Sequence, residues 1–295
     1  MGNLTELLKG VQKDVLLKNY TTFKIGGRAK YFFVAKNKKD LVSAVSAARK
    51  TGTPFFVLGG GSNILFSDRG FSGLIIKNEA KNFRIIKNNV IAESGAILAK
   101  IIAVVVQKGL AGIEQGSGIP GTLGGAIFGN AGWPKSGWAI GDLVASATLL
   151  MPDGKIKKKG KKWLNFSYRD SRLKKIKNEK PIILEAVLNL KKGRAETLKK
   201  EQQEILITRL NKIPKGFSAG SVFKNPAGKS AGELIEQCGL KGEKIGRAQI
   251  SEKHANFIIN LGGAKAKDVK KLITLAKTRV IDRFGVKLEE EIVVL

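Results

Sequence analysis

The sequence predicts an α+β protein with a large amino-terminal part and a smaller α+β unit after Pro214. Three observations support this fold class. Residues 31–65 read as strand, helix and strand, and residues 109–141 hold a dense share of the chain's 35 glycines, too many for a packed helix or strand. A long polar helix over about 194–212 reads as a connector between the two parts.

The amino-terminal elements follow from apolar periodicity. Within 31–65, Leu41, Val45 and Ala48 recur at helical spacing, and Gly52 ends the helix. The segments that follow are two short strands and an apolar helix that ends at Gly109, expected at Leu74–Lys77, Val90–Ala92 and Ile97–Lys108.

Strands and helices are also expected after the glycine-rich stretch. The turn signal Pro152-Asp153-Gly154 predicts a hairpin whose second strand is basic. The connector helix places Leu198, Ile205 and Leu206 on one face. The remaining predicted strands are Leu143–Met151, Pro181–Leu190, Ala255–Asn260 and Glu291–Leu295, and the remaining helices are Ala231–Cys238 and Asp268–Phe284.

The composition excludes several classes of site. A chain of 295 residues can bury a large core, and its single cysteine, Cys238, excludes an internal disulfide. One cysteine and one histidine cannot supply a four-ligand zinc site, so no metal is expected. A serine-histidine-aspartate arrangement could use only His254, which we interpret as a packing or hydrogen-bonding residue. Cys238 is expected in the core.

No membrane or secretory segment is expected. The longest strongly apolar stretch, Ile101–Val106, is far shorter than the roughly 20 residues of a spanning helix. The first ten residues lack a basic region followed by an apolar core and a cleavage site. We therefore expect a cytoplasmic protein without a membrane partner.

The charge is strongly basic, with 53 basic and 24 acidic residues and a net charge of +29. Such an excess favours an anionic partner. The lysines are spread along nearly the whole chain, however, and aromatic residues follow only one lysine run, that of Lys155–Lys162. We interpret the charge as a solvated lysine surface and expect no nucleic-acid partner. A non-enzymatic nucleic-acid or anion-binding protein remains the alternative from another class.

Two glycine-rich loops, Gly59–Leu65 and Gly116–Ala126, can each point bare backbone amides at one anion such as a diphosphate. Two tight turns are the alternative. Three glycines of the second loop formally satisfy the dinucleotide fingerprint GxGxxG, but they follow a helical segment and Pro120 stiffens the motif. Neither loop is followed by the GK[ST] of a phosphate-binding P-loop.

Several ordered motifs resemble the UDP-N-acetylenolpyruvoylglucosamine reductase family, in its shorter subtype. They run through nearly the whole chain and include LGGGSNIL at 58–65, GIPGTLGGAIFGNAG at 118–132, SYRDS at 167–171, SAGSVFKNP at 218–226 and SEKHANFIIN at 251–260. The resemblance implies a two-subdomain FAD-binding fold of the vanillyl-alcohol-oxidase/PCMH-type superfamily plus a smaller α+β substrate-binding domain. The expected divisions are 1–80, 81–205 and 206–295.

The resemblance also implies that the two glycine loops hold FAD. The implied cofactor-binding residues are Gly59, Gly60, Gly61, Ser62, Asn63, Ile119, Pro120, Gly121, Thr122, Gly124, Gly125, Ala126 and Asn130.

The implied reaction reduces the enolpyruvyl ether of a UDP-sugar to a lactyl ether, with hydride carried from NADPH through the flavin. It is a cytoplasmic step of peptidoglycan synthesis. Arg169 matches the family's catalytic arginine and Ser221 its proton donor. The implied substrate contacts are Tyr168, Lys224 and Asn225. We expect a monomer whose partners are the UDP-sugar and NADPH.

The third implied catalytic residue is the carboxylate Glu291. Glu290 stands where the family has proline, so a one-residue slip to Glu290 or Glu289 stays open. The loop at Gly132–Asp142 also departs from the family's continuation. A different flavin oxidoreductase of the same superfamily is the remaining alternative, and it need not keep Arg169, Ser221 and Glu291 together.

Overall fold

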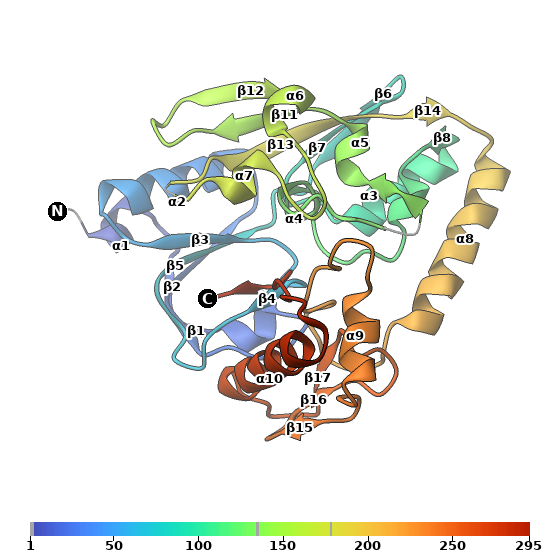
Figure 1. The fold of residues 1–295 in the computed structure, drawn as a ribbon. Helices are drawn as coiled ribbons and strands as arrows, with labels where there is room; N and C mark the ends of the chain where they lie inside the picture. Colours follow the sequence, from blue (N-terminus) through green and yellow to red (C-terminus); the bar gives the residue numbers. More distant parts are fainter. Residues whose placement is uncertain (1–2, 134–135, 178) are drawn as a thin grey trace. The chain divides into compact units, whose positions relative to one another are not determined.

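The computed structural model describes residues 3–133, 136–177 and 179–295 (Figure 1). Helices and strands alternate along the chain, which confirms the α+β class. The chain forms two compact units. Unit 1 comprises Met1–Val11, Phe32–Gly60 and Leu74–Arg209, and unit 2 comprises Gln12–Tyr31, Gly61–Gly73 and Leu210–Leu295. The division of the first 205 residues into two FAD-binding subdomains stays a prediction.

Unit 1 contains a five-stranded antiparallel sheet in the order β12-β11-β13-β7-β6. Its strands are β6 (Phe83–Ile86), β7 (Asn89–Glu93), β11 (Val144–Leu150), β12 (Ile156–Gly160) and β13 (Ile182–Asn189). The β11–β12 hairpin confirms the turn predicted at 152–154, and the Met151 N–H donates to the Lys155 carbonyl across it.

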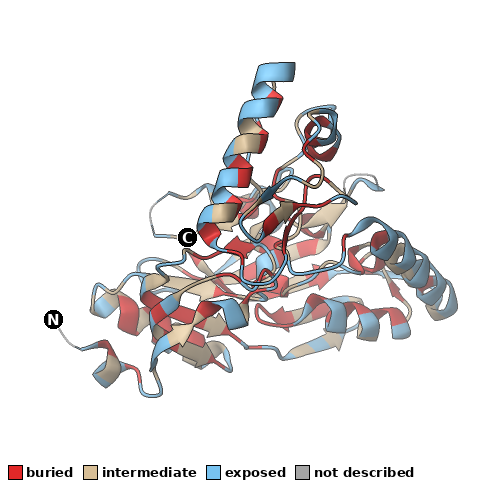
Figure 2. Cartoon of the chain, turned by 90° about the horizontal axis from the view of Figure 1, so that it is seen from below, coloured by how far each residue is buried: buried red, intermediate tan, exposed pale blue. Residues whose placement is uncertain are grey.

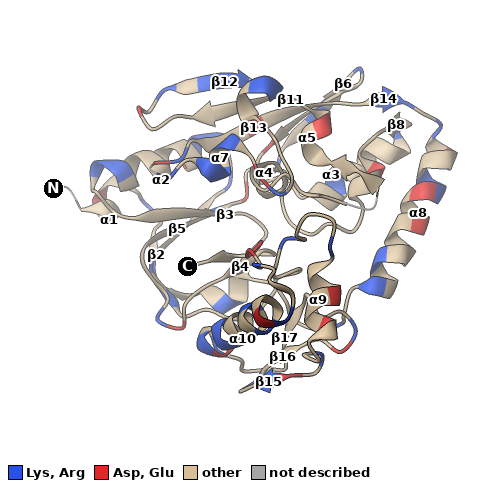
Figure 3. Cartoon of the chain, viewed as in Figure 1, with Lys and Arg blue, Asp and Glu red and all other residues tan. Residues whose placement is uncertain are grey.

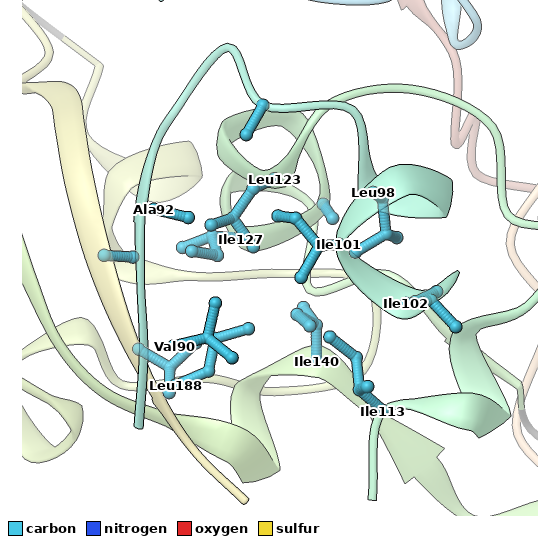
Figure 4. Close-up of a cluster of buried hydrophobic side chains, with 14 of the residues drawn as sticks. Val90, Ala92, Leu98, Ile101, Ile102, Ile113, Leu123, Ile127, Ile140 and Leu188 are labelled. Atoms are coloured by element: carbon cyan, nitrogen blue, oxygen red, sulfur yellow. The ribbon is translucent and has the colours of Figure 1, made fainter. Parts of the chain in front are cut away.

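Helices α3 (Leu98–Gln107) and α4 (Leu123–Phe128) pack on this sheet and bury their apolar sides. Figure 4 shows Ile101 and Ile102 of α3 with Leu123 and Ile127 of α4 in one cluster. The cluster also includes residues of β7 and β13, so the two helices are fixed against the sheet by apolar burial.

Unit 1 is completed by short elements and the long helix α8 (Ala195–Lys212), whose last residues belong to unit 2. The short elements are α1 (Leu4–Leu7), β8 (Leu110–Ala111), η2 (Glu114–Gly116), β9 (Gly132–Trp133), β10 (Trp138–Ala139), α5 (Ile140–Leu143), α6 (Lys161–Leu164), α7 (Arg172–Lys175) and β14 (Lys191–Lys192).

A second sheet has four strands in the order β1-β2-β5-β3, and both β2 and β5 run from one unit into the other. Its elements are β1 (Gln12–Leu16), β2 (Arg28–Ala35), β3 (Phe55–Leu58) and β5 (Phe71–Asn78), with η1 (Leu17–Tyr20) and α2 (Lys38–Lys50) between them. Strands β3 and β5 are parallel. The Asn37 side chain caps α2 by accepting from the Asp40 N–H, which explains where this helix starts.

Unit 2 is the smaller α+β unit and has its own buried cluster. Its elements are β4 (Ile64–Leu65), α9 (Ala231–Gln237), β15 (Lys244–Ile245), β16 (Ala248–Ile250), β17 (Ile258–Asn260), α10 (Ala266–Phe284) and β18 (Val293–Val294). Strands β15, β16 and β17 form an antiparallel sheet. Helix α10 buries one side, as the burial colours of Figure 2 illustrate, and it is capped after Phe284 by Gly285, which has a φ of +65°.

Two sequence predictions need correction. The glycine-rich stretch was expected to exclude a helix, yet α4 contains Gly124 and Gly125. A Cβ at Gly124 would lie 2.8 Å from the Ser94 Cβ, so the missing side chain allows this turn of helix to approach the neighbouring segment. The terminal strand is also shorter than predicted, because only Val293–Val294 pair with β4.

Lysine and arginine are spread over α8, α10, β12 and other elements (Figure 3). Lys155, Lys157 and Lys158 of the basic hairpin are exposed, as expected for a solvated edge strand. Within the three described ranges, no helix combines the length and the apolar character that crossing a membrane requires.

Candidate active site

The two glycine loops lie against each other within unit 1. A Cβ at Gly59 would lie 2.5 Å from the Thr122 Oγ1, and a Cβ at Gly60 would lie 2.6 Å from the Gly121 Cα. Backbones can approach this closely only where side chains are missing. The glycines that predicted an anion-binding loop therefore also bring the two loops together.

The carbonyl groups of these loops are held by protein donors. The Gly59 carbonyl accepts from Lys77 Nζ at 2.5 Å, the Gly61 carbonyl from the Thr22 N–H at 3.1 Å, and the Gly121 carbonyl from the Leu98 N–H at 3.1 Å. A backbone cradle attracts an anion only if its carbonyl oxygens point elsewhere. The loops fit a diphosphate such as that of FAD on this count.

Lys77 was not predicted as a functional residue. It follows the buried run Leu74–Ile76 on β5, and burial lowers the pKa of its amine, which the charge of Glu79 partly offsets. A lysine directly after an apolar strand core was the available signal. Its bond to the Gly59 carbonyl holds the first loop, and its ammonium adds positive charge beside that loop.

The remaining predicted cofactor residues occupy varied positions. Ile119 and Ala126 pack with the hydrophobic cluster of unit 1, and the Thr122 side chain caps α4 by accepting from the Gly125 N–H at 3.4 Å. Ser62 and Asn63 continue the first loop into unit 2. Their contacts with FAD, and those of Pro120, stay predictions.

Arg169 lies on a tight turn of unit 1. The Ser167 and Asp170 backbones exchange two hydrogen bonds of 3.1 Å, and Arg169 has a left-handed φ of +53°. Such a conformation is unfavourable for a side chain and persists only when the surroundings enforce it. The Arg169 Nη1 donates to the Gly132 carbonyl at 2.9 Å, and its guanidinium lies 5.7 Å from the Tyr168 ring centroid.

Asn130 supports this turn. Its Nδ2 donates to the Ser167 carbonyl at 2.8 Å and its Oδ1 accepts from the Gly141 N–H at 3.0 Å. Both groups of the buried amide thus hold protein backbone, and its contact with FAD stays a prediction. Pro134 and Lys135 of the divergent loop at 132–142 lie outside the described residues.

Arg209, at the end of the unit 1 part of α8, is a buried arginine. Its Nη2 donates to the Gln115 carbonyl at 2.9 Å, and its guanidinium carbon lies 4.0 Å from the Trp133 ring centroid. Burial and the positive charge of Arg169 lower the pKa of Arg209 to about 10. Helical spacing from Leu198 and Ile205 would have placed it on the buried face.

Unit 2 brings Ser221 and Glu291 into adjacent segments. The Glu291 N–H donates to the Val222 carbonyl at 2.8 Å, and the neighbouring pair Phe223 and Glu290 form an antiparallel bridge. Asn63, in the unit 2 part of the first glycine loop, donates from Nδ2 to the Glu291 carbonyl at 3.2 Å. Residues that are 228 positions apart are joined here.

The two glutamates that precede Glu291 each form an ion pair with a lysine of unit 2. Glu290 pairs with Lys277 of α10 at 2.5 Å, and Glu289 pairs with Lys224 at 3.2 Å with its side chain 70% exposed. Glu291 as the carboxylate position stays a prediction.

The predicted substrate contacts are divided between the units. Tyr168 is 47% exposed in unit 1. Lys224 is engaged with Glu289, and Asn225 accepts from the Ala231 N–H of α9 through its Oδ1 at 3.1 Å. The contacts of these three residues with a substrate stay predictions.

His254 is partly buried in unit 2, where its Nδ1 accepts from the Asn256 N–H at 3.2 Å and its ring lies 5.0 Å from that of Phe257. Burial first, and then the charge of Lys241, lower the pKa of His254. Its backbone N–H donates to Ser251 Oγ at 3.3 Å.

The lowered pKa predicts how stability depends on pH. The unfolded chain takes up a proton near pH 6.5 and the folded chain only at lower pH, so the free energy of unfolding should fall as the pH drops below about 6.5. The slope for one group is at most about 1.4 kcal/mol per pH unit. Urea unfolding at pH 7.5 and 5.5 measures it, with His254→Gln as the comparison. Because this is the chain's only histidine, the variant should lose less stability than the parent, and equal losses would contradict the assignment.

Comparisons with known proteins agree with this geometry. Residues 29–160 match the FAD binding domain, and residues 212–295 match the carboxyl-terminal domain of UDP-N-acetylenolpyruvoylglucosamine reductase. The reductase of Caldicellulosiruptor bescii is 44% identical over 95% of this chain and 89% of its own length. That of Rubrobacter xylanophilus is 38% identical over 99% of this chain and 97% of its own length.

Solved structures give the same result. The crystal structure of the UDP-N-acetylenolpyruvylglucosamine reductase of Thermus caldophilus has a TM-score of 0.82 and 35% identity, and the match covers 96% of this chain and 98% of that one. The glucooligosaccharide oxidase of Acremonium strictum shares the fold alone, with a TM-score of 0.50 and 15% identity over 98% of this chain and 61% of that one. The predicted flavoprotein fold class is thereby confirmed. This chain belongs to the UDP-N-acetylenolpyruvoylglucosamine reductase family and is an FAD-dependent oxidoreductase.

Proposed function

We propose that this chain reduces the enolpyruvyl ether of UDP-N-acetylglucosamine-enolpyruvate to the lactyl ether of UDP-N-acetylmuramate, with NADPH as the electron donor. The observation that carries the proposal is that Ser221 and Glu291 lie on adjacent segments of unit 2. The Glu291 N–H donates a hydrogen bond to the carbonyl of Val222, the residue after Ser221. The family to which the chain belongs supplies the reaction class. The reaction is a step of peptidoglycan synthesis, and we place it in the cytoplasm.

FAD supplies hydride transfer between NADPH and the substrate when it is bound. Gly59, Gly60, Gly121 and Thr122 would hold its diphosphate through backbone amides, because the loop carbonyls of Gly59 and Gly121 already accept from Lys77 and Leu98. The Lys77 ammonium and the Arg209 guanidinium add positive charge to the same unit.

The substrate requires a cation and an acid from the protein. Hydride added to the terminal carbon of the double bond pushes electron density onto the conjugated carboxylate, and the adjacent carbon must then take a proton. We assign the cation to Arg169, whose planar, permanently charged fork suits a carboxylate that gains charge. The turn at 167–170 and the bond to Gly132 hold this side chain before substrate arrives.

We assign the proton donor to Ser221. A serine hydroxyl is a weak acid, so its alkoxide must be stabilised and its proton resupplied. We assign Glu291 to the third catalytic position, a carboxylate that can take part in acid–base chemistry. Its backbone N–H donates to the Val222 carbonyl beside Ser221, which supports this choice.

Substrate-dependent NADPH oxidation tests the proposal. The flavin-loaded chain should oxidise NADPH when the enolpyruvyl UDP-sugar is added, with the lactyl ether formed in equal amount. UDP-N-acetylglucosamine, which lacks the double bond, is the matched control and should give no oxidation above background. Equal oxidation with both sugars, or none with the enolpyruvyl ether, would favour a different flavin oxidoreductase.

A further inference from the structure

The segment that carries Ser221 is held along both edges. On one side, Ser221 forms an antiparallel bridge with Phe257, and the Val222 N–H donates to the Asn256 carbonyl at 2.8 Å. On the other side, the Lys224 N–H donates to the Glu289 carbonyl at 2.9 Å. The segment therefore behaves as a short central strand, although it lies in none of the regular strands.

Asn256 supplies most of the bonds on the first side. It is 3% exposed, and its side chain bonds both backbone groups of one residue: Oδ1 accepts from the Phe223 N–H at 2.9 Å, and Nδ2 donates to the Phe223 carbonyl at 2.8 Å. The backbone carbonyl of Asn256 also accepts from the Val222 N–H, so Asn256 holds both residues that follow Ser221. The side-chain amide of Asn256 thus makes the two hydrogen bonds to Phe223 that the backbone of a neighbouring strand would otherwise make.

Asn256 is itself anchored. Its backbone N–H donates to His254 Nδ1, and His254 in turn donates its backbone N–H to Ser251 Oγ. A buried side chain with fixed partners at both ends has one orientation. Asn256 therefore holds the backbone of Val222 and Phe223, which directly follow Ser221.

We propose that Asn256 is a positioning residue that aligns the Ser221 hydroxyl for proton transfer, an inference that rests on the proposed role of Ser221 as proton donor. A proton donor acts only within hydrogen-bond reach of its acceptor, and a displacement of about 1 Å can cost about a hundredfold in rate. Asn256 touches neither the substrate nor the flavin in this role.

The most informative variant is Asn256→Asp. Aspartate keeps the shape and the acceptor for the Phe223 N–H, but it cannot donate to the Phe223 carbonyl. Asn256→Ala removes both bonds. Asn260→Asp is the matched control, because Asn260 is also a buried asparagine of unit 2 whose side chain bonds only backbone, that of Phe23, Lys24, Gly262 and Ala264.

The two half-reactions separate positioning from general destabilisation. In anaerobic rapid mixing, Asn256→Asp should slow reoxidation of the reduced flavin by the enolpyruvyl UDP-sugar about tenfold or more, and leave flavin reduction by NADPH within about twofold of the parent. Asn260→Asp should leave both rates within about twofold, at a similar loss of melting temperature. Equal slowing of both half-reactions, or the same reoxidation rate in both variants, would contradict the proposal. Asn256→Ala should repeat the selective slowing; if it fails to fold, the aspartate pair decides alone.

A double-mutant comparison tests whether Asn256 acts through Ser221. In a Ser221→Ala background, Asn256→Asp should slow reoxidation no further, because the hydroxyl it aligns is already missing. Independent, multiplying effects would overturn the inference. If the parent chain is not reoxidised by the enolpyruvyl UDP-sugar at all, the proposed function fails. If the parent is reoxidised and Asn256→Asp matches it, only the positioning role fails.

Discussion

Ser221→Ala is expected to lower turnover of the enolpyruvyl UDP-sugar by about a hundredfold or more, the scale of a lost proton donor. Flavin should remain bound and should still be reduced by NADPH, because hydride transfer to the flavin needs no proton from this hydroxyl. The measurement is the rate of each half-reaction under anaerobic conditions.

A control separates loss of the hydroxyl from loss of stability. Ser230→Ala removes a hydroxyl from the same unit, where Ser230 caps α9 by accepting from the Glu233 N–H at 3.3 Å. It should cost about 1 kcal/mol of stability and leave reoxidation near the parent rate. Full turnover in Ser221→Ala would remove this residue from the mechanism.

Gly60→Ala is expected to release FAD. The added Cβ would lie 2.6 Å from the Gly121 Cα, a distance that backbone atoms cannot accept without moving apart. Overpacking between the two loops costs about 1 to 3 kcal/mol, which would weaken cofactor binding by about fivefold to a hundredfold or more. Titration of flavin-free protein with FAD, followed by flavin fluorescence, measures the change.

Gly160→Ala is the matched control for this variant. A Cβ at Gly160 would meet its nearest neighbour, the Ala145 carbonyl oxygen, at 3.9 Å, which is ordinary contact. Both glycines lie in unit 1 and neither has a positive φ. Equal FAD affinity in the two variants would count against the loop cradle, whereas a loss confined to Gly60→Ala supports it.

Much of the fold could be predicted because the responsible forces are local. The spacing of Leu41, Val45 and Ala48 predicts α2, and the turn at 152–154 predicts the β11–β12 hairpin. Helix α4 could not be predicted this way. Its glycines are unfavourable for a helix by themselves, and they are explained only by Ser94, a neighbour about 30 residues earlier in the chain.

The candidate site shows the same limit more strongly. Glycine-rich loops can be recognised from composition. The close approach of the two loops at Gly60 and Gly121, however, depends on the fold of unit 1 as a whole. Asn256 lies in the SEKHANFIIN motif at 251–260, but the motif does not reveal its two hydrogen bonds to Phe223, 33 residues away. Arg209 could have been predicted only in part. Helical spacing is enough to place it on the buried face of α8, but not to place its guanidinium against the Trp133 ring.

The visible absorption spectrum of the purified chain, recorded anaerobically through one catalytic cycle, tests the central claim most directly. We predict flavin bands in an amount equal to the protein, bleaching when NADPH is added, and return of the bands on addition of the enolpyruvyl UDP-sugar. A colourless protein that takes up no added FAD, or a reduced flavin that this substrate leaves bleached, would contradict the account.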